Sequence, residues 1–209
     1  KKLITCARDL IDERGIQNVT IRSIADRAEM NSATMYNYFQ DLDELITYAC
    51  ISYFQEYCER LYTEYRFLSE NEPEEVYLMT WDLFCQYAFR HPDEMYQLFF
   101  GKYSGELGNV IHKYYQWFPE ETAELSQNLK EMLADADMFE RNIHVLRPIL
   151  PEGTSEKDLE TMNELTVAYL QMLLRELAED QSGKYTPEMQ QKRMMQACVF
   201  LLDSVTGNK

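Results

Sequence analysis

The stretch that most constrains the fold of this chain runs from residue 20 to residue 45. It reads TIRSIADRAEMNSATMYNYFQDLDEL and contains two short helical patterns separated by three residues. In the first pattern, apolar residues recur at positions i, i+3, i+4 and i+7, so they share one face of a helix. These residues are Ile21, Ile24, Ala25 and Ala28. Thr20 stands directly before them, where its hydroxyl can cap the free amides of the first turn.

The second pattern begins after a turn at residues 29–31. Asn31 is a favourable N-cap residue for it, and Met35 together with the pair Tyr38 and Phe39 is predicted to face inward. The outer face is then left with Ser32, Ala33, Thr34, Tyr36 and Asn37. Two short helices joined by a tight turn, with an exposed face on the second, predict a helix-turn-helix that binds the major groove of DNA.

A helix predicted from Leu3 to Arg14, with Gly15 as its C-terminal stop, precedes this motif. With that helix, residues 1–45 resemble the N-terminal domain of the TetR family of transcriptional repressors. The resemblance lies in G-x-x-x-x-T-I-R-x-I-A-x-x-A from Gly15 to Ala28, and in T-M-Y-N-Y-F from Thr34 to Phe39, followed by Leu45. The rest of the chain is similar to the family only in architecture.

The resemblance implies an all-α protein with two parts. Residues 1–46 are expected to form a three-helix helix-turn-helix DNA-binding domain, and residues 47–209 a larger helical domain for effector binding and dimerisation. It also implies a homodimer on a near-palindromic operator of double-stranded DNA, released by a small-molecule effector whose identity the resemblance does not give. The aromatic residues discussed below predict a small hydrophobic or aromatic effector, cations included. By match to the family motif, the residues expected at the DNA backbone are Thr20, Asn31 and Tyr36. Those expected nearest the base edges are Ser32, Ala33, Thr34 and Asn37.

Three positions depart from the family pattern. Glu29 stands where the family often has Gly, Leu42 where it often has a phosphate-contacting Lys, and Asn37 where it often has His. The amide of Asn37 can pair with an adenine edge, a contact that contributes about 1–3 kcal/mol of discrimination. Residues 1–45 hold six Lys and Arg against eight Asp and Glu, whereas phosphate neutralisation is the main sequence-independent source of DNA affinity. Weak DNA binding or a narrow operator preference is therefore expected.

An alternative from another class fits the same departures. A helical ligand-binding or protein-binding module that keeps this fold, with weak or lost DNA binding, would also carry Leu42 and an acidic N-terminal domain. An enzyme is disfavoured, because the chain has no nucleophile elbow, no phosphate-binding glycine loop and no catalytic pairing of side chains. No cofactor is expected.

The formal net charge of −16 lies mostly after residue 45. Such a charge repels nucleic acid and anionic membranes, so DNA contact is expected only on the outer face of the motif. It also favours cationic over anionic effectors, although solvated acidic faces are the simpler interpretation. The start has no signal-peptide pattern, and no run approaches the roughly 18 apolar residues of a membrane span, which predicts a cytoplasmic protein outside the membrane.

The residues after the motif predict a series of further helices. Asp41 and Glu44 form a capping box that opens a long helix with apolar positions up to Leu61. Breaks are predicted at residues 69–73, 91–92, 101–108 and 147–153, with a further interruption between Leu133 and Phe139. Two strong helices, 155–179 and 187–205, carry broad apolar stripes that suit a four-helix dimer interface with two helices from each protomer. The alternative is that they close the core of their own protomer.

Aromatic residues are unevenly distributed, since 20 of the 27 lie between Tyr48 and Phe118. Aromatic side chains make ordinary core, but buried Tyr hydroxyls and Trp indoles need partners, so these rings also fit a ligand cavity. They would hold an apolar or aromatic molecule by stacking or cation–π contacts. The candidate ligand-binding residues are Tyr57, Tyr77, Trp81, Phe84, Tyr87, Phe99, Tyr103, Tyr114 and Trp117.

Two further patterns predict no site. The five cysteines are odd in number and lack zinc spacing, so they are expected to be reduced core thiols. Asp137, Glu140 and His144 share one helical face, which suits a divalent metal, but an acidic cluster beside an ordinary His is favoured. No metal site is predicted.

Overall fold

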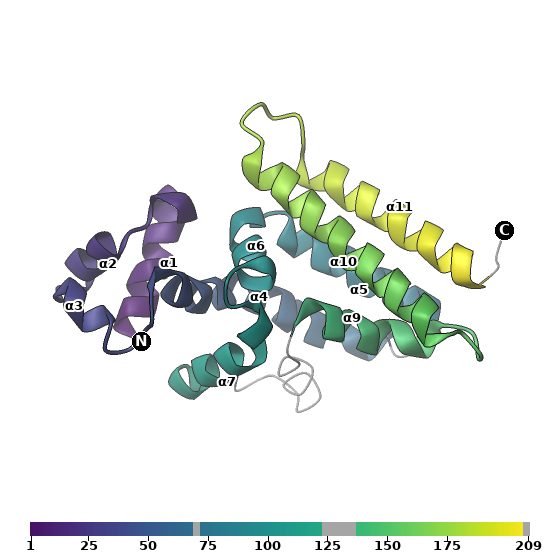
Figure 1. The fold of residues 1–209 in the computed structure, drawn as a ribbon, viewed down its shortest axis with the longest axis horizontal. Helices are drawn as coiled ribbons and strands as arrows, with labels where there is room; N and C mark the ends of the chain where they lie inside the picture. The colour runs from purple at the N-terminus through teal and green to yellow at the C-terminus, as the bar shows by residue number, and fades with distance from the viewer. Residues whose placement is uncertain (69–71, 123–136, 207–209) are drawn as a thin grey trace. The chain divides into compact units, whose positions relative to one another are not determined.

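The computed structural model describes residues 1–68, 72–122 and 137–206. These residues form α-helices and short 3-10 turns, with no strand in the described part of the chain (Figure 1). The predicted all-α fold is therefore confirmed. By their internal contacts, the described residues divide into two compact units, one of residues 1–55 and 93–122 and the other of residues 56–92 and 137–206 outside the gap at 69–71.

The first unit contains the predicted motif. Its helices are α1 (Lys2–Arg14), α2 (Ile21–Ala28), α3 (Ser32–Met35), the first part of α4 (Leu42–Leu68), α6 (Pro92–Phe100) and α7 (Leu107–Trp117). The 3-10 turns are η1 (Ile16–Asn18), η2 (Ser104–Glu106) and η3 (Pro119–Thr122). One apolar side chain or more from each of the first four helices is buried in the core, as Leu10, Ile24, Met35 and Leu45 illustrate.

Local sequence signals set the ends of these helices. Gly15 ends α1 with a φ of 78°, a conformation that glycine adopts readily, and its N–H donates to the carbonyl of Ile11 at 2.8 Å. The predicted capping box opens α4. The Asp41 carboxylate accepts from the backbone N–H of Glu44 at 2.9 Å, and the Glu44 carboxylate accepts from the N–H of Gln40 at 2.6 Å.

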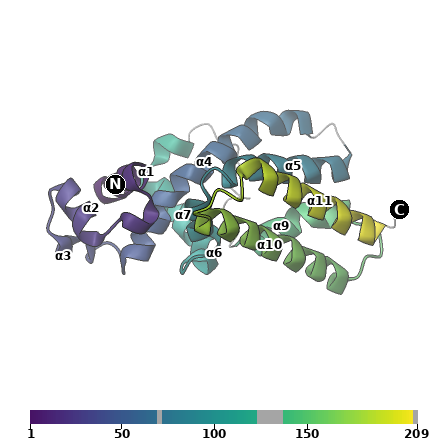
Figure 2. The same cartoon turned by 90° about the horizontal axis from the view of Figure 1, so that it is seen from above.

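The described residues of the second unit form the second part of α4 and the helices α5 (Pro73–Ala88), α9 (Met138–Leu146), α10 (Glu156–Glu179) and α11 (Pro187–Thr206), with the turn η4 (Arg147–Ile149). Ser155 caps α10, since its hydroxyl accepts from the N–H of Asp158. Figures 1 and 2 both show α10 and α11 side by side, and α11 also packs against α5. Leu170, Leu174, Met194 and Cys198 fill the core between them.

The described residues also bear on several other predictions. All five cysteines are buried free thiols, as predicted, and burial raises the pKa of each of them. The Asp137 carboxylate caps α9 by accepting from the N–H groups of Phe139 and Glu140, and no metal-binding group of three side chains occurs among the described residues. None of the described helices is long and apolar enough to cross a membrane. The interruption predicted before Phe139 falls largely outside the described residues, and α9 begins at Met138.

Candidate DNA-binding surface

Helix α2 is held at its start by a reciprocal cap. The backbone N–H of Ser23 donates to the Thr20 hydroxyl at 3.1 Å, and the N–H of Thr20 donates to the Ser23 hydroxyl at 3.0 Å. Thr20 is therefore the N-cap residue that the sequence predicts, and its side chain is exposed at the helix start. A hydroxyl at this position can also meet a phosphate oxygen.

The turn between α2 and α3 depends on an unusual backbone conformation. Glu29 has a φ of 54°, and it is the one residue other than glycine with positive φ in the described part of the chain. The N–H of Met30 donates to the carbonyl of Ala25 at 2.9 Å, which closes the end of α2. Left-handed conformation costs a residue with a side chain roughly 1–2 kcal/mol, so Glu29 holds this turn under mild strain.

Helix α3 is shorter than the pattern suggested. Asn31 caps it by accepting from the N–H of Ala33 at 2.9 Å, and regular helix ends at Met35. The N–H groups of Tyr38 and Phe39 both donate to the carbonyl of Met35, each at 3.0 Å, so the chain continues as a turn rather than as a helix. Residues 31–40, which comprise α3 and this turn, are called the recognition segment below.

The early end of α3 decides which rings are buried. Met35 and Phe39 are buried, as predicted, but the inward orientation predicted for Tyr38 is wrong, because its side chain is 61% exposed. The prediction assumed a continuous helical face from Met35 to Phe39, whereas the turn places only Phe39 in the core. Tyr38 is therefore a surface residue that the sequence analysis did not include among the DNA-binding candidates.

The predicted outer face is largely exposed. Thr20, Asn31, Ala33 and Asn37 are exposed, Tyr36 is 58% exposed, and Ser32 and Thr34 are half-buried. The two neighbouring rings Tyr36 and Tyr38 thus project from the chain directly after α3. Neighbouring apolar side chains that form an exposed patch commonly mark an interaction surface.

Aromatic residues pack against the buried side of the recognition segment. The ring of Phe39 contacts Tyr48 of α4, with centroids 5.6 Å apart, and Trp117 of α7, with centroids 6.2 Å apart. The Lys113 ammonium lies 5.1 Å from the Trp117 ring centroid, a cation–π distance. The recognition segment is therefore packed against α4 and α7 through Phe39.

Polar contacts fix the start of α4 in the same unit. The Asp41 carboxylate accepts hydrogen bonds from the Lys102 ammonium and, at 3.0 Å, from the Tyr103 hydroxyl. Partial burial raises the pKa of Asp41, but the hydrogen bonds from Lys102, from the Glu44 N–H and from Tyr103 outweigh it and leave the pKa below its usual value. Asp41 is thus ionised at neutral pH and ties α6 and its following loop to the motif.

The nine candidate ligand-binding residues fall into both units. In the second unit, Tyr57 contacts Phe84 and Tyr87, and Trp81 contacts Phe84 and Tyr77, so five of the candidates form one continuous ring cluster. The other four belong to the first unit and are Phe99, Tyr103, Tyr114 and Trp117. There, Trp117 supports Phe39, and Tyr103 and Tyr114 donate hydrogen bonds to carboxylates.

A buried polar chain adjoins the ring cluster of the second unit. The Trp81 indole N–H donates to the side-chain carbonyl of Asn142 at 3.1 Å, and the Asn142 amide donates to Asn163 at 2.8 Å. The Tyr77 hydroxyl is fully buried and makes no hydrogen bond to any of the described residues, although Thr166, Trp81 and Asn142 lie near enough to affect its pKa. Sequence periodicity gave no signal for Asn142 and Asn163.

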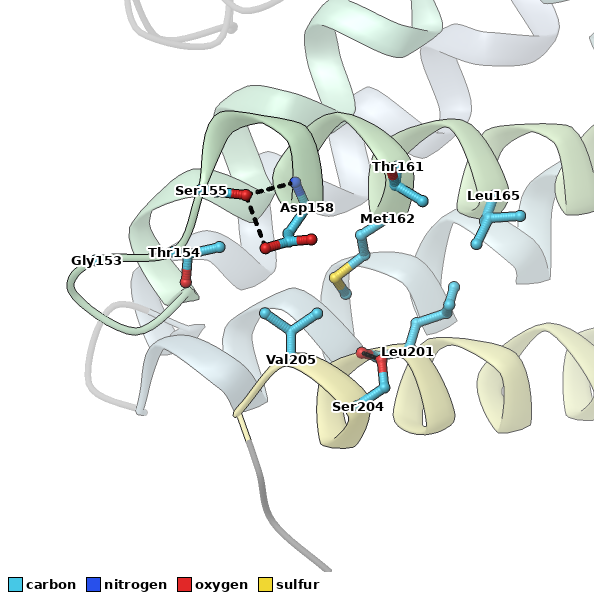
Figure 3. A pocket seen from close by; sticks show the side chains of 10 residues that line it. All are labelled: Gly153, Thr154, Ser155, Asp158, Thr161, Met162, Leu165, Leu201, Ser204 and Val205. Atoms are coloured by element: carbon cyan, nitrogen blue, oxygen red, sulfur yellow. Dashed lines mark hydrogen bonds between the residues drawn. The ribbon is translucent and has the colours of Figure 1, made fainter.

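Two of the surface hollows formed by described residues of the second unit are lined by no candidate ligand-binding residue. One, of about 450 Å³, lies between the start of α10 and the end of α11, with Ser155 and Asp158 at its polar end and Met162, Leu201 and Val205 along its apolar wall (Figure 3). The other, of about 310 Å³, is lined by residues that include Arg60, Met79, Asp82 and Met195.

The described residues are helical and carry this exposed segment at the end of a helix-turn-helix, and a family model matches the same part of the chain. Residues 3–49 match the family model of the bacterial regulatory proteins of the tetR family. No curated protein sequence matches the chain. The N-terminal domain is therefore that of the TetR family, as the sequence motif indicated.

Solved structures extend the likeness to the whole fold. RolR in complex with resorcinol has a TM-score of 0.57 and 18% identity, covering 99% of this chain and 88% of that one. The Thermus thermophilus FadR, a TetR-family repressor in complex with lauroyl-CoA, has a TM-score of 0.55 and 18% identity, covering 96% and 91%. A TetR regulator from a Rhodococcus species has a TM-score of 0.56 and 13% identity, covering 96% and 93%. The chain has the fold of TetR-family transcriptional regulators.

Proposed function

We propose that this chain is a ligand-responsive transcriptional repressor of the TetR type. Residues 1–46 bind a near-palindromic operator, and residues 47–209 bind an effector and form a homodimer. One observation carries the proposal: Tyr36 and Asn37 project into solvent directly after α3, while Met35 and Phe39 anchor the same segment in the core. A segment fixed on one side and exposed on the other is the geometry that a major-groove contact requires.

Within this proposal the exposed side chains divide by chemistry. Thr20, Asn31 and Tyr36 meet backbone phosphate, because each has a donor at the start of a helix or at the rim of the exposed face. Ser32, Ala33, Thr34 and Asn37 approach the base edges. Asn37 is the strongest candidate for sequence discrimination, since its amide can donate to and accept from adenine at once.

The dimer is supported by apolar residues that the second unit leaves in water. Leu165 and Met172 are exposed on α10, and Val199 and Phe200 are exposed on α11, where Phe200 is 72% exposed. The inward faces of the same helices already fill the protomer core, so closing that core does not explain these side chains. Two adjacent helices with exposed apolar faces suit an isologous four-helix interface with a second copy.

The effector is proposed to bind in the second unit, which lies within residues 47–209. Its ring cluster and buried polar chain favour a small aromatic or hydrophobic molecule with a polar substituent, which apolar walls and a few hydrogen-bonding groups would orient. Structures of the same fold carry resorcinol in RolR and lauroyl-CoA in FadR, so the fold accommodates ligands of both kinds. The effector releases the operator by favouring a dimer whose recognition segments no longer match the spacing of about 34–36 Å between successive major grooves.

The test begins with an operator selected by the wild-type protein from a pool of random duplexes. Tyr36→Ala is expected to reduce affinity for this operator at least tenfold, because it removes both the phosphate contact and the ring, and gel-shift titration measures the change. Tyr36→Phe keeps the ring and serves as the matched control, with a smaller loss. Because Tyr36 is exposed, neither variant should alter the thermal unfolding temperature. Operator affinity that does not change in Tyr36→Ala contradicts the proposal.

A second candidate function has one observation in its favour. No Lys or Arg occurs from residue 28 to residue 59, which is the whole stretch from the turn to the middle of α4. A helical module that keeps the fold for ligand or protein binding, with weak or lost DNA binding, would show this composition. Random-pool selection separates the two functions, since the module would enrich no sequence.

A further inference from the structure

The recognition segment lies in a stretch of the chain whose charge is wholly negative. Residues 28–59 contain no Lys or Arg, while Glu29, Asp41, Asp43 and Glu44 lie next to the segment. DNA binding by a protein depends on cations that replace the counterions of the phosphates. A surface of this sign needs at least one cation from another part of the fold.

The cations of α2 are engaged with carboxylates. Arg27 forms a two-point hydrogen-bonded ion pair with Glu13 of α1. Arg22 lies 3.9 Å from the carboxylate of Asp26, one turn along the same helix. Neither arginine belongs to the segment that follows the turn.

Lys102 lies at the end of the recognition segment. Its ammonium donates to the carboxylate of Asp41, the residue directly after the segment, and its side chain is 59% exposed. The Tyr103 hydroxyl donates to the same carboxylate oxygen and holds it in place. A lysine that is distant in sequence is therefore positioned at the surface beside a residue that follows the exposed Tyr38 by three positions.

The backbone at the end of α6 positions Lys102 beside Asp41. The chain leaves α6 at Gly101, whose N–H donates to the carbonyl of Gln97 at 3.1 Å. A side chain at Gly101 would bring its Cβ within 2.2 Å of the same carbonyl oxygen, so this tight exit needs glycine. The next residue is Lys102, and its direction is thus set by the turn as well as by Asp41.

We propose that Lys102 supplies a cationic phosphate contact beside the recognition segment, which has no Lys or Arg of its own, so that the DNA-binding surface extends to the loop after α6. The ammonium has three donors, and it can hold Asp41 with one while another binds a phosphate oxygen. Asp41 then acts as a positioning residue, because it keeps a flexible lysine side chain beside the segment before DNA arrives. This inference rests on the proposed DNA-binding function.

The test is the salt dependence of operator binding. For the selected operator, the logarithm of the association constant is measured against the logarithm of salt concentration for wild type and Lys102→Gln. Removing one phosphate-binding cation lowers the steepness of this plot by about 0.9, so a dimer in which both copies carry Lys102→Gln should show a decrease of about 1.8. Lys102→Arg keeps the cation and should retain the wild-type slope.

Lys157→Gln is the matched control, since it removes the same charge from an exposed position on α10 in the other unit. Its slope should equal that of wild type. A slope for Lys102→Gln equal to wild type overturns the inference and leaves the repressor function intact. Absence of any selected operator with the wild-type protein overturns both. A loss of affinity in Lys102→Gln at constant slope also contradicts the phosphate contact, because it indicates a structural role alone.

Discussion

The buried hydroxyl of Tyr77, in the second unit, has no hydrogen-bond partner within the part of the chain that the structure describes. Burial raises the pKa of this phenol, so the group is neutral at any ordinary pH. The nearby donors are already used: Trp81 donates its indole N–H to Asn142, and Thr166 donates its hydroxyl hydrogen to the carbonyl of Met162, so neither has a hydrogen left for the phenol oxygen. A buried polar group in this state carries the cost of lost hydration without a compensating bond.

Tyr77→Phe is therefore expected to raise the free energy of unfolding by about 1 kcal/mol, since it removes the unpaired hydroxyl and keeps the ring. Urea denaturation measures the change. Asn142→Leu is the contrasting variant, expected to destabilise by about 1–3 kcal/mol because Trp81 and Asn163 then lose their partners. If the Tyr77 hydroxyl orients the effector, Tyr77→Phe should also weaken the rise in unfolding temperature that the effector produces. Destabilisation by Tyr77→Phe as large as that by Asn142→Leu would mean that the hydroxyl is bonded in solution.

Single residues at helix ends could be predicted from the sequence because capping is local. Thr20, Asn31 and Asp41 cap the helices that follow them, as their spacing indicated. Tyr38 could not be placed in the same way. Its exposure depends on where α3 stops, and the turn after α3 buries Phe39 instead, against Tyr48 and against Trp117, which is 78 residues away in the chain.

At the scale of whole elements, α10 and α11 each present two apolar faces. One face is buried in the protomer, and the other leaves Leu165, Met172, Val199 and Phe200 exposed. The sequence predicted both helices and their broad stripes. It left open whether the stripes serve one core or two, because periodicity counts apolar positions without showing which of them a protomer can cover by itself.

Phe200→Glu is expected to convert the proposed dimer to monomer, because a carboxylate at the centre of an apolar interface loses hydration without a partner. Sedimentation equilibrium over a range of protein concentrations measures the shift. The helical circular dichroism signal should be retained, since Phe200 is outside the protomer core. Met79→Glu, at an exposed position on α5, is the control and should leave the dimer unchanged. An unaltered dimer in Phe200→Glu would place the interface elsewhere.

The contacts of α6 and α7 with the motif could not be read from the sequence. Lys102, Tyr103 and Trp117 lie more than 60 residues after the residues they touch in the motif. The uneven distribution of aromatic residues predicted a ligand-binding role for Tyr103 and Trp117. In the structure, Tyr103 donates a hydrogen bond to Asp41, and Trp117 packs against Phe39. That ligand-binding role remains a prediction.

For the whole molecule, the dominant quantity is the formal charge of −16. A field of this sign repels the DNA backbone everywhere except at the few positions where a cation is presented. Non-specific association depends on contacts with the DNA backbone alone. The repulsion should therefore lower the affinity for non-specific DNA more than the affinity for the operator, which also gains from base contacts.

We expect the affinity for a random duplex at physiological salt to fall below the usual non-specific range, with a dissociation constant above about 10⁻⁴ M. Filter binding of one labelled random duplex, with the selected operator as the reference, measures this. At low salt the repulsion should become stronger for the chain as a whole, although the contacting cations also bind more tightly. Micromolar binding to random DNA would show that the acidic surface does not control the affinity for non-specific DNA.

The fold class followed from the N-terminal motif because that motif combines caps, turn and aromatic pair in a single register. The effector could not be predicted, since rings that line a cavity and rings that fill a core have the same spacing in a sequence. The second unit shows this directly: its ring cluster is continuous, and the polar chain of Asn142 and Asn163 beside it has no periodic signature.

The chain has only two tryptophans, and each belongs to a different unit. Trp117 touches Phe39 directly behind the recognition segment, whereas Trp81 donates its indole N–H within the buried polar chain. Intrinsic fluorescence therefore provides two separate natural reporters. With Trp81→Phe the emission follows the first unit, and with Trp117→Phe it follows the interior of the second unit, so the order in which the two units respond to an added ligand can be timed without attaching a dye.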